Sequence, residues 1–299
     1  ALSGRLEHVP DRHTFPGQVP ADEFSLRPLG CEQAAGFVWV HFGEVRESLN
    51  DFLAELGPAL DAYGIADWGI LQDTTLELSA NWKTVLDVWN ESYHAQGIHA
   101  QILDAIDDVN VELELHERHS RMVVPFAKPS PRRVAGDTLT PVMVGLLKSA
   151  GLDPKLFEGR AGDVRAAIQQ TRRQANPRQA HLSDAQLVDC FNYHAFPNLN
   201  LAVWADHAVI YRYRPHPEDP QRSFLDLLSL GQSSGRARPQ HENWQLDDRR
   251  IDQVLAQDIA AVTRTQRGMT SAGFVGLHLS SGEARIEHTH AVLERYLSR

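Results

Sequence analysis

The sequence predicts an α+β fold in which an antiparallel sheet is flanked by helices. Short runs that alternate apolar and polar residues, or that are rich in β-branched residues, are typical of strands. They are interspersed with longer stretches in which apolar residues recur at the period of a helix. Two of the alternating runs turn back on themselves, which favours antiparallel pairing. The length of 299 residues allows one large domain or two small ones.

The first part of the chain is expected to hold irregular chain, then a strand and a helix. Residues 1–30 are rich in proline and glycine and are predicted to run as extended chain along a surface. Residues 36–42, "GFVWVHF", are aromatic and β-branched and stop at a glycine, as a strand does. Residues 48–63 have the apolar spacing of a helix, with Ser48 in position to cap its N-terminus.

The sheet is expected to come mainly from four later runs. Residues 74–80 and residues 223–231 each have the pattern of one strand. Residues 110–126 and residues 199–215 each have the pattern of two strands joined by a turn, and the second turn is expected around Asp206. These runs together predict an antiparallel sheet.

Helices are expected between and after these strands. Residues 141–186 have helical periodicity, with a fresh helix start at Ser183. The arginine-rich part of this region, residues 155–181, is most simply a solvated face, with a lid or a docking surface as the alternative. Residues 247–274 and 282–297 are predicted to form two last helices joined by a glycine-rich link.

Composition excludes several classes of protein. The net charge of −10 is spread along the chain without a long basic run, so neither nucleic acid nor a membrane surface is an expected partner. No apolar run approaches the roughly 20 residues that cross a bilayer, and residues 1–17 lack the apolar core of a signal peptide, so we expect a cytoplasmic protein. Cys31 and Cys190 are far apart and form no CxxC pair, so any metal must be bound by histidine and carboxylate.

Residues 81–100, "NWKTVLDVWNESYHAQGIHA", hold the densest group of potential metal ligands. Glu91 and His94 are three residues apart and would share a helical face. His94 and His99 are five apart and would point about 140° away from each other unless the helix breaks, which is easiest at Gly97. Two histidines at the lip of a broken helix leave coordination positions open, and with one carboxylate they would form the facial triad of non-haem Fe(II) sites.

The residues alone leave the third ligand open. The carboxylates near the start of the penultimate helix all compete for this role: Glu242, Asp247, Asp248, Asp252 and Asp258. Tyr93 is either a core aromatic or a hydroxyl beside the metal. Because the chain has 15 histidines, the alternative is that this pair lies on an ordinary helix and binds nothing.

The same stretch closely resembles the catalytic-domain signature of Rieske-type non-haem iron oxygenases, the large or α subunits of aromatic-ring-hydroxylating oxygenases. That signature has N-W-K, then a carboxylate three residues before the histidine of Y-H, then a second histidine five residues on. Three other segments, spread along most of residues 10–299, resemble landmarks of the family: residues 36–42, residues 196–203, "FPNLNLAV", and residues 256–271, "AQDIAAVTRTQRGMTS".

The resemblance assigns roles to residues at matching positions. His94, His99 and Asp258 would bind a mononuclear Fe(II), and Glu91 would be the acid that connects an iron ligand to the Rieske cluster of a neighbouring subunit. The implied fold is the helix-grip, lipid-transfer-like type. We expect five residues to line the substrate pocket: Asp87, Tyr93, Ala95, His194 and Val254.

One departure from the family is large. Its Rieske domain binds a [2Fe–2S] cluster through C-x-H and C-x-x-H pairs, and this sequence has neither. Residues 1–30 resemble the tail of that domain and a linker, and residues 31–299 resemble the catalytic mononuclear iron domain. The cluster is therefore expected only in a longer chain or a neighbouring subunit.

The resemblance implies a terminal oxygenase that uses Fe(II) and O₂ to hydroxylate or dihydroxylate a small organic substrate. We expect this substrate to be aromatic. Electrons would come from a ferredoxin, a flavin reductase or both, and the assembly would be a homotrimer or an αβ hexamer. The alternatives are an oxidative demethylase of the same family, favoured slightly by glutamate at position 91, and a non-enzymatic ligand-binding module of the same fold. A zinc hydrolase using His94, His99 and Asp258 is a further alternative.

Overall fold

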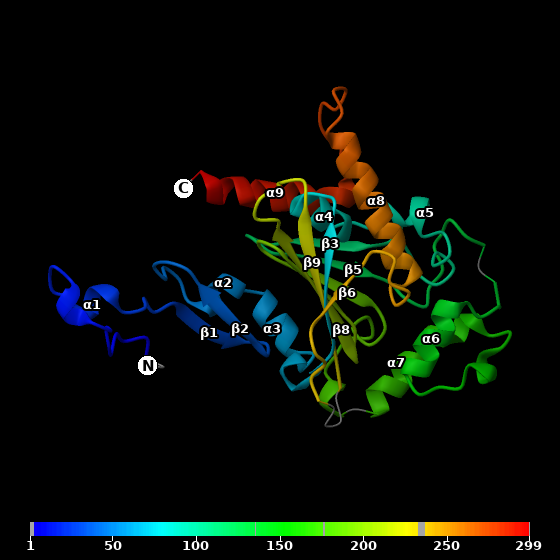
Figure 1. Ribbon diagram of the computed structural model, residues 1–299. Helices are drawn as coiled ribbons and strands as arrows, with labels where there is room; N and C mark the ends of the chain where they lie inside the picture. The colour runs from blue at the N-terminus through cyan, green and yellow to red at the C-terminus, as the bar shows by residue number, and fades with distance from the viewer. Residues whose placement is uncertain (1–2, 135, 176, 233–236, 299) are drawn as a thin grey trace.

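Eight strands form one sheet at the centre of the computed structural model, which describes residues 3–134, 136–175, 177–232 and 237–298 (Figure 1). The strand order is β10-β3-β9-β8-β7-β6-β5-β4, and each neighbouring pair is antiparallel except β10 with β3. The prediction of an α+β fold with an antiparallel sheet is confirmed. The strands of this sheet are β3 (Gly69–Leu78), β4 (Glu112–Leu115), β5 (Ser120–Val124), β6 (Cys190–Ala195), β7 (Leu199–Val203), β8 (His207–Pro215), β9 (Ser223–Gly231) and β10 (Glu242–Trp244).

Helices pack on both faces of this sheet. One face contacts α4 (Trp82–Trp89), α8 (Gln253–Met269) and α9 (Ala284–Leu297), and the turn of helix α5 (Ala95–Ile98) lies against α8. The opposite face packs against α2 (Leu49–Leu53) and α3 (Leu56–Asp61). The remaining helices are α6 (Pro141–Ser149) and α7 (Val164–Ala175), which pack on each other, α1 (Ala21–Phe24) and six short 3₁₀ helices at Arg12–Thr14, Ile65–Asp67, Pro154–Phe157, Ala161–Asp163, Pro177–Gln179 and Ser281–Glu283.

The register of the central strands decides which side chains face the α4 and α9 side. Ser120 on β5 is opposite His194 on β6, which is opposite Asn200 on β7, which is opposite Tyr211 on β8. Residues directly opposite each other share a face of the sheet. A row of polar side chains therefore crosses the middle of the sheet beneath the helices.

Three predicted helices differ from the observed ones. The helix predicted over residues 48–63 is two helices, because Ala54 has a positive φ of 44° and interrupts it, although Ser48 caps α2 as predicted. The helix predicted from Trp82 ends at Trp89 and not at Gly97. Residues after Ser183 form turns with no helix, and β6, a fully buried strand, follows directly.

The arginine-rich region was predicted to be a solvated face, but two of its arginines are bound to groups of the body. Arg172 is buried and its guanidinium donates to the carbonyl of Leu187 and to Asp206 at 2.7 Å. Arg165 forms an ion pair with the buried Asp189. These side chains link α7 to the chain just before β6 and just after β7, because their charged groups find carbonyl and carboxylate partners there.

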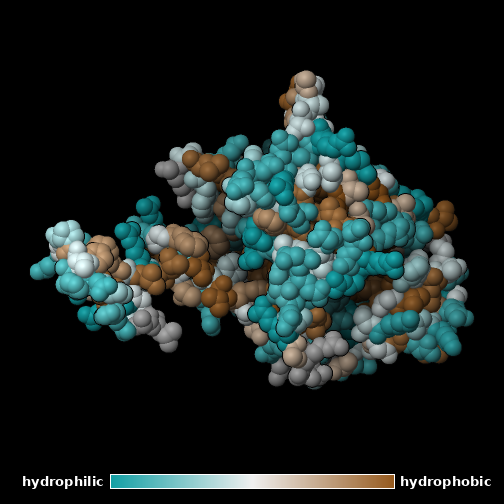
Figure 2. Space-filling model, viewed as in Figure 1, coloured by the Kyte–Doolittle hydropathy of each residue, from teal (hydrophilic) through white to brown (hydrophobic). Residues whose placement is uncertain are grey.

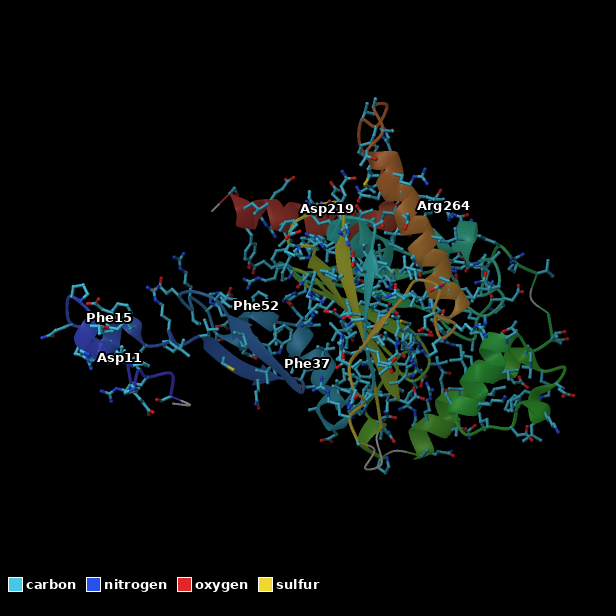
Figure 3. All side chains as sticks on the ribbon, in the orientation of Figure 1. Asp11, Phe15, Phe37, Phe52, Asp219 and Arg264 are labelled. Carbon is cyan, nitrogen blue, oxygen red and sulfur yellow. The ribbon has the colours of Figure 1, made fainter. Side chains whose placement is uncertain are left out.

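The N-terminal segment lies beside the main body and ends in a separate hairpin. β1 (Gly30–Ala34) and β2 (Phe37–His41) form a two-stranded sheet, and Figure 1 shows the residues before it leading away from the body. Its backbone hydrogen bonds stay within the segment, such as the one from the N–H of Leu26 to the carbonyl of Gly4. The segment therefore does not run along the surface of the body, which is where it was predicted to lie. Phe37 and Phe52, labelled in Figure 3, pack where the hairpin meets the body.

Apolar side chains are exposed along this segment and its hairpin. Figure 2 shows brown patches over this part of the molecule, and Phe24, Leu26, Val38 and Phe42 are each more than half exposed. Among the residues that the structure describes, no helix is both long and apolar enough to cross a bilayer.

Asp226 joins three strands of the sheet through side-chain hydrogen bonds. It accepts from Thr75 on β3, from Arg212 and from Arg214 on β8. Burial raises the pKa of Asp226, but the hydrogen bonds from Arg214, Thr75 and Arg212 outweigh burial and lower the pKa to about 2. The folded state therefore binds the Asp226 proton less tightly than the unfolded chain does.

We expect Asp226→Asn to lower the free energy of unfolding by about 2 kcal/mol at pH 7. Because the pKa is depressed by folding, this stabilisation is complete above about pH 4 and is lost as the pH falls towards 2. Urea unfolding of both proteins between pH 7 and pH 2.5 measures the difference. Glu77→Gln is the control: Glu77 pairs with Arg222 on the surface, so its loss should cost less than about 1 kcal/mol. A pH-independent difference for Asp226→Asn would contradict the prediction.

Candidate metal centre

His94, His99 and Asp258 converge on one point, as the sequence motif and the resemblance together predict. His99 Nε2 lies 2.8 Å and His94 Nε2 3.6 Å from Asp258 Oδ1. One potential ligand atom of each of the three residues lies within 4.8 Å of the other two. Ligand atoms about 2.1 Å from a metal are about 3 Å apart when at right angles, so these separations fit a single ion.

The chain reaches this geometry by ending one helix and starting another. α4 ends at Trp89, Glu91 to Tyr93 form a turn, and His94 and His99 flank the single turn of α5. The two imidazoles are therefore on either end of a short helix with their ring centroids 5.1 Å apart. Asp258 comes from the middle of α8, which packs beside α5.

The environment of His99 leaves a lone pair facing a carboxylate. His99 Nδ1 donates to Gln257 Oε1 at 2.9 Å, and Gln101 also donates to that oxygen at 2.7 Å. In the neutral ring Nε2 then carries the lone pair, and it faces Asp258 Oδ1 at 2.8 Å. Two acceptors this close require a cation or a proton between them, so the donor set fits a bound metal ion.

His94 is oriented by Glu91 in the same manner. Glu91 Oε1 contacts His94 Nδ1, and Glu91 Oε2 accepts from the backbone N–H of His94 at 3.0 Å. Nδ1 is thus used by the carboxylate and Nε2 points at Asp258. The proximity of Glu91 and His94 was predicted from a shared helical face, but the structure achieves it in a turn outside the helix.

Burial and charge act in opposite directions on this site. Burial lowers the pKa of His99, and hydrogen bonds with Asp258 and Gln257 raise it above its ordinary value. His99 and Asp258 are buried, whereas the His94 side chain is 24% exposed. The site is therefore closed on the His99 side and opens beside His94.

The five residues predicted to line the substrate pocket fall in different places. Ala95 is buried at the start of α5, and Val254 is half-buried on α8, one turn before Asp258. Tyr93 is 56% exposed beside His94, so it is not a core aromatic. Asp87 is buried on α4, and His194 is buried on β6. That these five residues line the substrate pocket stays a prediction.

Asp87 and His194 have partners of their own. Asp87 accepts from His290 Nε2 at 3.0 Å; burial raises the pKa of Asp87, and the hydrogen bond with Asp87 raises the pKa of His290. His194 Nδ1 lies 3.1 Å from the carbonyl oxygen of Leu199, and burial lowers the pKa of His194 to about 3. His194 is therefore a neutral imidazole at physiological pH.

Two residues of the site were missed from the sequence. Gln257 and Gln101 orient His99, as described above. The only signal for Gln257 is its position directly before Asp258 on the late helix, where the two side chains reach the same histidine from adjacent positions. Gln101 has no such signal, since a glutamine two residues after a histidine is common.

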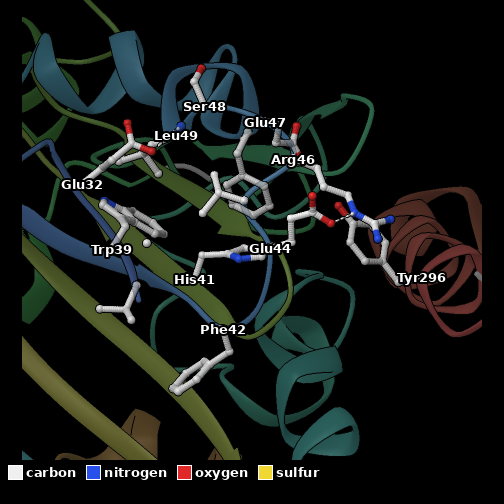
Figure 4. Close-up of a pocket in the computed structure, with 14 residues that line it drawn as sticks. Glu32, Trp39, His41, Phe42, Glu44, Arg46, Glu47, Ser48, Leu49 and Tyr296 are labelled. Carbon is white, nitrogen blue, oxygen red and sulfur yellow. Dashed lines mark hydrogen bonds and ion pairs between the residues drawn. The ribbon is translucent and has the colours of Figure 1, made fainter. Parts of the chain in front are cut away.

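The cavity drawn in Figure 4 lies apart from this centre. It has a volume of about 570 Å³ and lies between the β1–β2 hairpin and α2. Trp39, His41 and Phe42 line it from the hairpin and Tyr296 from α9. None of the residues predicted to hold a metal or a substrate lines this cavity.

Known proteins resemble this chain both in sequence and in fold. The glycine betaine monooxygenase oxygenase subunit of Chromohalobacter salexigens is 24% identical over 293 residues, which cover 91% of this chain and 59% of that protein. The carnitine monooxygenase oxygenase subunit of Escherichia coli K12 is 30% identical over 133 residues, 43% of this chain and 34% of that protein. The chain thus spans about 59% of the length of the first relative.

Solved structures give the same fold. A quaternary ammonium Rieske monooxygenase superimposes with a TM-score of 0.65 at 16% identity, covering 99% of this chain and 69% of that one.

The model of the family described as ring hydroxylating alpha subunit (catalytic domain) matches residues 65–299. The match includes the turn with Glu91, both histidines and Asp258. This chain therefore belongs to the ring-hydroxylating α-subunit family of Rieske oxygenases and carries its catalytic domain.

Proposed function

We propose that this chain is the catalytic part of a Rieske-type terminal oxygenase that binds one Fe(II) and uses O₂ to oxidise a small organic cation. The observation that supports this most is the convergence of His94, His99 and Asp258, two imidazoles and one carboxylate with an open side. When bound, the iron would supply the redox chemistry that activates O₂ for reaction with the substrate.

The protein's own contribution is to hold and orient the ligands. Gln257 and Gln101 fix the tautomer of His99, and Glu91 fixes that of His94, so both Nε2 atoms are available for the metal. Three protein ligands leave room for O₂ and for substrate. The buried side of the site excludes water, which keeps the reaction directed to the substrate.

Glu91 is proposed to have a second role in electron entry. Its buried carboxylate contacts Nδ1 of the partly exposed His94, and Glu91 is not one of the residues whose ligand atoms meet. A [2Fe–2S] cluster in a longer chain or neighbouring subunit would pass electrons through this contact. A ferredoxin or a flavin reductase would feed that cluster, in an assembly that we propose to be a homotrimer or an αβ hexamer.

A quaternary ammonium compound is the substrate class that we propose in place of the aromatic hydrocarbon expected from the sequence. The relatives matched over most or part of the chain are named for glycine betaine and carnitine. Ala95, next to His94, belongs to a buried apolar cluster against which Phe126, Trp204 and Tyr211 pack. Aromatic faces attract a methylated cation, so this cluster suits such a substrate.

Oxygen insertion at an N-methyl group would make the same protein an oxidative demethylase. One oxygen atom enters a C–H bond, the other leaves as water, and two electrons and two protons are consumed. The hydroxyl of the resulting N–CH₂OH group then loses its proton as the C–N bond breaks and its electron pair stays on nitrogen, which releases formaldehyde, the demethylated amine and a proton. Monooxygenation and demethylation are therefore successive steps: the protein would hydroxylate the N-methyl group, and the product would then lose formaldehyde.

We expect His94→Ala, His99→Ala and Asp258→Ala each to lose iron, because each removes one of three protein ligands. Asp252→Ala is the matched control on the same helix. Asp252 caps α8 by accepting from the backbone N–H groups of Val254 and Leu255, so its loss should cost about 1 kcal/mol of stability and leave the iron bound. Metal analysis per chain after anaerobic loading with Fe(II) measures this.

Two outcomes of the metal analysis would contradict the assignment. A full equivalent of iron in His94→Ala or His99→Ala would show that the triad is not the metal site. A wild-type protein that retains zinc and rejects Fe(II) would favour the zinc hydrolase alternative instead.

We expect Glu91→Gln to keep iron and lose electron entry. Glutamine retains the size of the side chain and a contact with His94 but removes the charge. In the full-length protein, turnover driven by the reductase should fall by a factor of about 100 or more. Turnover driven by hydrogen peroxide, which delivers oxygen and electrons together, should fall much less. Loss of iron in this variant would make Glu91 a ligand, and equal loss of both rates would remove its role in electron entry.

We expect trimethylammonium compounds, and not aromatic hydrocarbons, to couple electron consumption to product in the full-length protein. Glycine betaine, carnitine and naphthalene, each supplied with the reductase and O₂, can be compared by NADH consumption and by formaldehyde release. Cation–aromatic attraction predicts productive turnover with one of the first two. Hydroxylated naphthalene without formaldehyde from either cation would restore the aromatic substrate class.

A further inference from the structure

A buried polar network lies between the middle of the sheet and the end of α4. Asn192 and Asn200, on β6 and β7, are at most 6% exposed, and so are Asn90 at the end of α4 and Arg285 and Thr289 on α9. Buried polar groups of this kind are costly unless they are hydrogen-bonded to one another.

Arg285 sets the direction of the hydrogen bonds, because a guanidinium can only donate. Its Nη2 donates to Asn192 Oδ1 at 3.1 Å, and its Nε donates to Ser120 Oγ at 3.0 Å. Asn192 therefore presents its oxygen, and Asn200 must present its amide nitrogen to that oxygen, at 2.9 Å. Burial lowers the pKa of Arg285 to about 9, so the group still carries its charge at pH 7.

The amide nitrogen of Asn200 connects this network to α4. It lies 3.0 Å from Asn90 Oδ1 and 3.3 Å from the carbonyl oxygen of Trp89. Trp89 is the last residue of α4, and its carbonyl has no partner within the helix. Asn90 in turn donates from its own nitrogen to Thr289 on α9 at 3.3 Å.

The end of α4 is therefore capped by a strand that follows more than one hundred residues later. The two amide hydrogens of Asn200 are shared among three oxygens, of which the last carbonyl of the helix is the most distant at 3.3 Å. The side chain of Asn90 is held away from solvent by this contact. The helix stops there without a glycine or a proline. Glu91 is the next residue, and its carboxylate contacts His94.

We propose that Asn200 is a positioning residue for the metal centre: by capping α4 from β7, it fixes the point from which Glu91 and His94 are presented. Asn192 and Arg285 hold the Asn200 amide in the donating orientation. The inference rests on the proposed function for its consequence in metal binding. The claim that Asn200 caps α4 concerns only the segment from Asp87 to Ile98 and does not depend on a metal.

Asn200→Ala and Asn200→Asp test the cap. Alanine removes the amide, and aspartate keeps its shape but places acceptors opposite the oxygens of Trp89 and Asn90. In metal-free protein we expect backbone hydrogen exchange in residues 87–98 to become about tenfold faster in both variants. In Co²⁺ titrations of the same samples, we expect the affinity to fall about tenfold or more.

Asn198→Ala is the matched control. Asn198 lies two residues earlier, and its amide nitrogen donates to the carbonyl oxygen of Tyr213 at 2.7 Å, so the variant also loses a side-chain hydrogen bond to the sheet. The side-chain hydrogen bond that Asn198→Ala loses ends on β8 and not on α4, so both exchange in residues 87–98 and Co²⁺ affinity should match the wild type. If Asn200→Ala aggregates, Asn200→Ser, which retains one donor, is measured in its place against the same two criteria.

The outcomes separate this inference from the proposed function. Exchange and Co²⁺ affinity equal to those of Asn198→Ala would overturn the positioning role, as would wild-type behaviour of Asn200→Asp. A wild-type protein that binds no Co²⁺ would contradict the proposed function, and the exchange rates would still decide whether Asn200 caps α4.

Discussion

Three electron-pair donors face one another at the centre of this protein, and the surrounding structure must hold them there. His94 Nε2, His99 Nε2 and Asp258 Oδ1 would separate if nothing bound between them, because lone pairs and negative charge repel. The two histidines are therefore held from behind, His99 by Gln257 and His94 by Glu91. The arrangement has the character of a site prepared in advance for a cation.

The fold meets this demand by bringing two distant segments to one face of the sheet. His94 and His99 flank α5, which follows α4, and α8 arrives with Asp258 after the last long strand, β9. α8 packs on both α4 and α5, so helix packing holds the carboxylate close to the two ends of α5. Rigid elements hold ligand atoms more accurately than loops do.

Features that depend on local pattern were predicted from the sequence. The strands β7, β8 and β9 alternate or are β-branched, and each lies where its pattern indicated. β6 was missed although Phe191 and Tyr193 alternate along it with Asn192 and His194; all six of its residues are buried. The two histidines were found from their spacing, whereas Asp258 came from the resemblance alone, since several carboxylates near it had equal claims.

The end of α4 shows why a correct motif was first given an incorrect geometry. Nothing within residues 82–99 marks Trp89 as the last helical residue, because the groups that cap it are on β7 and α9. Such a cap depends on residues that meet only after the sheet has formed, so neither propensity nor periodicity reports it. The contact between Glu91 and His94 was still predicted, because residues three apart can meet in a turn as well as in a helix.

The two histidines of the centre are not equivalent, and the difference lies in their partners. His99 donates to a neutral amide, while His94, the more exposed histidine, contacts the buried carboxylate of Glu91. A charged partner makes an imidazole a stronger electron donor than a neutral one does, so the two histidines would not be equivalent as metal ligands. Under the proposed function, His99 would supply structural support, and Glu91 with His94 would be the pair that receives electrons.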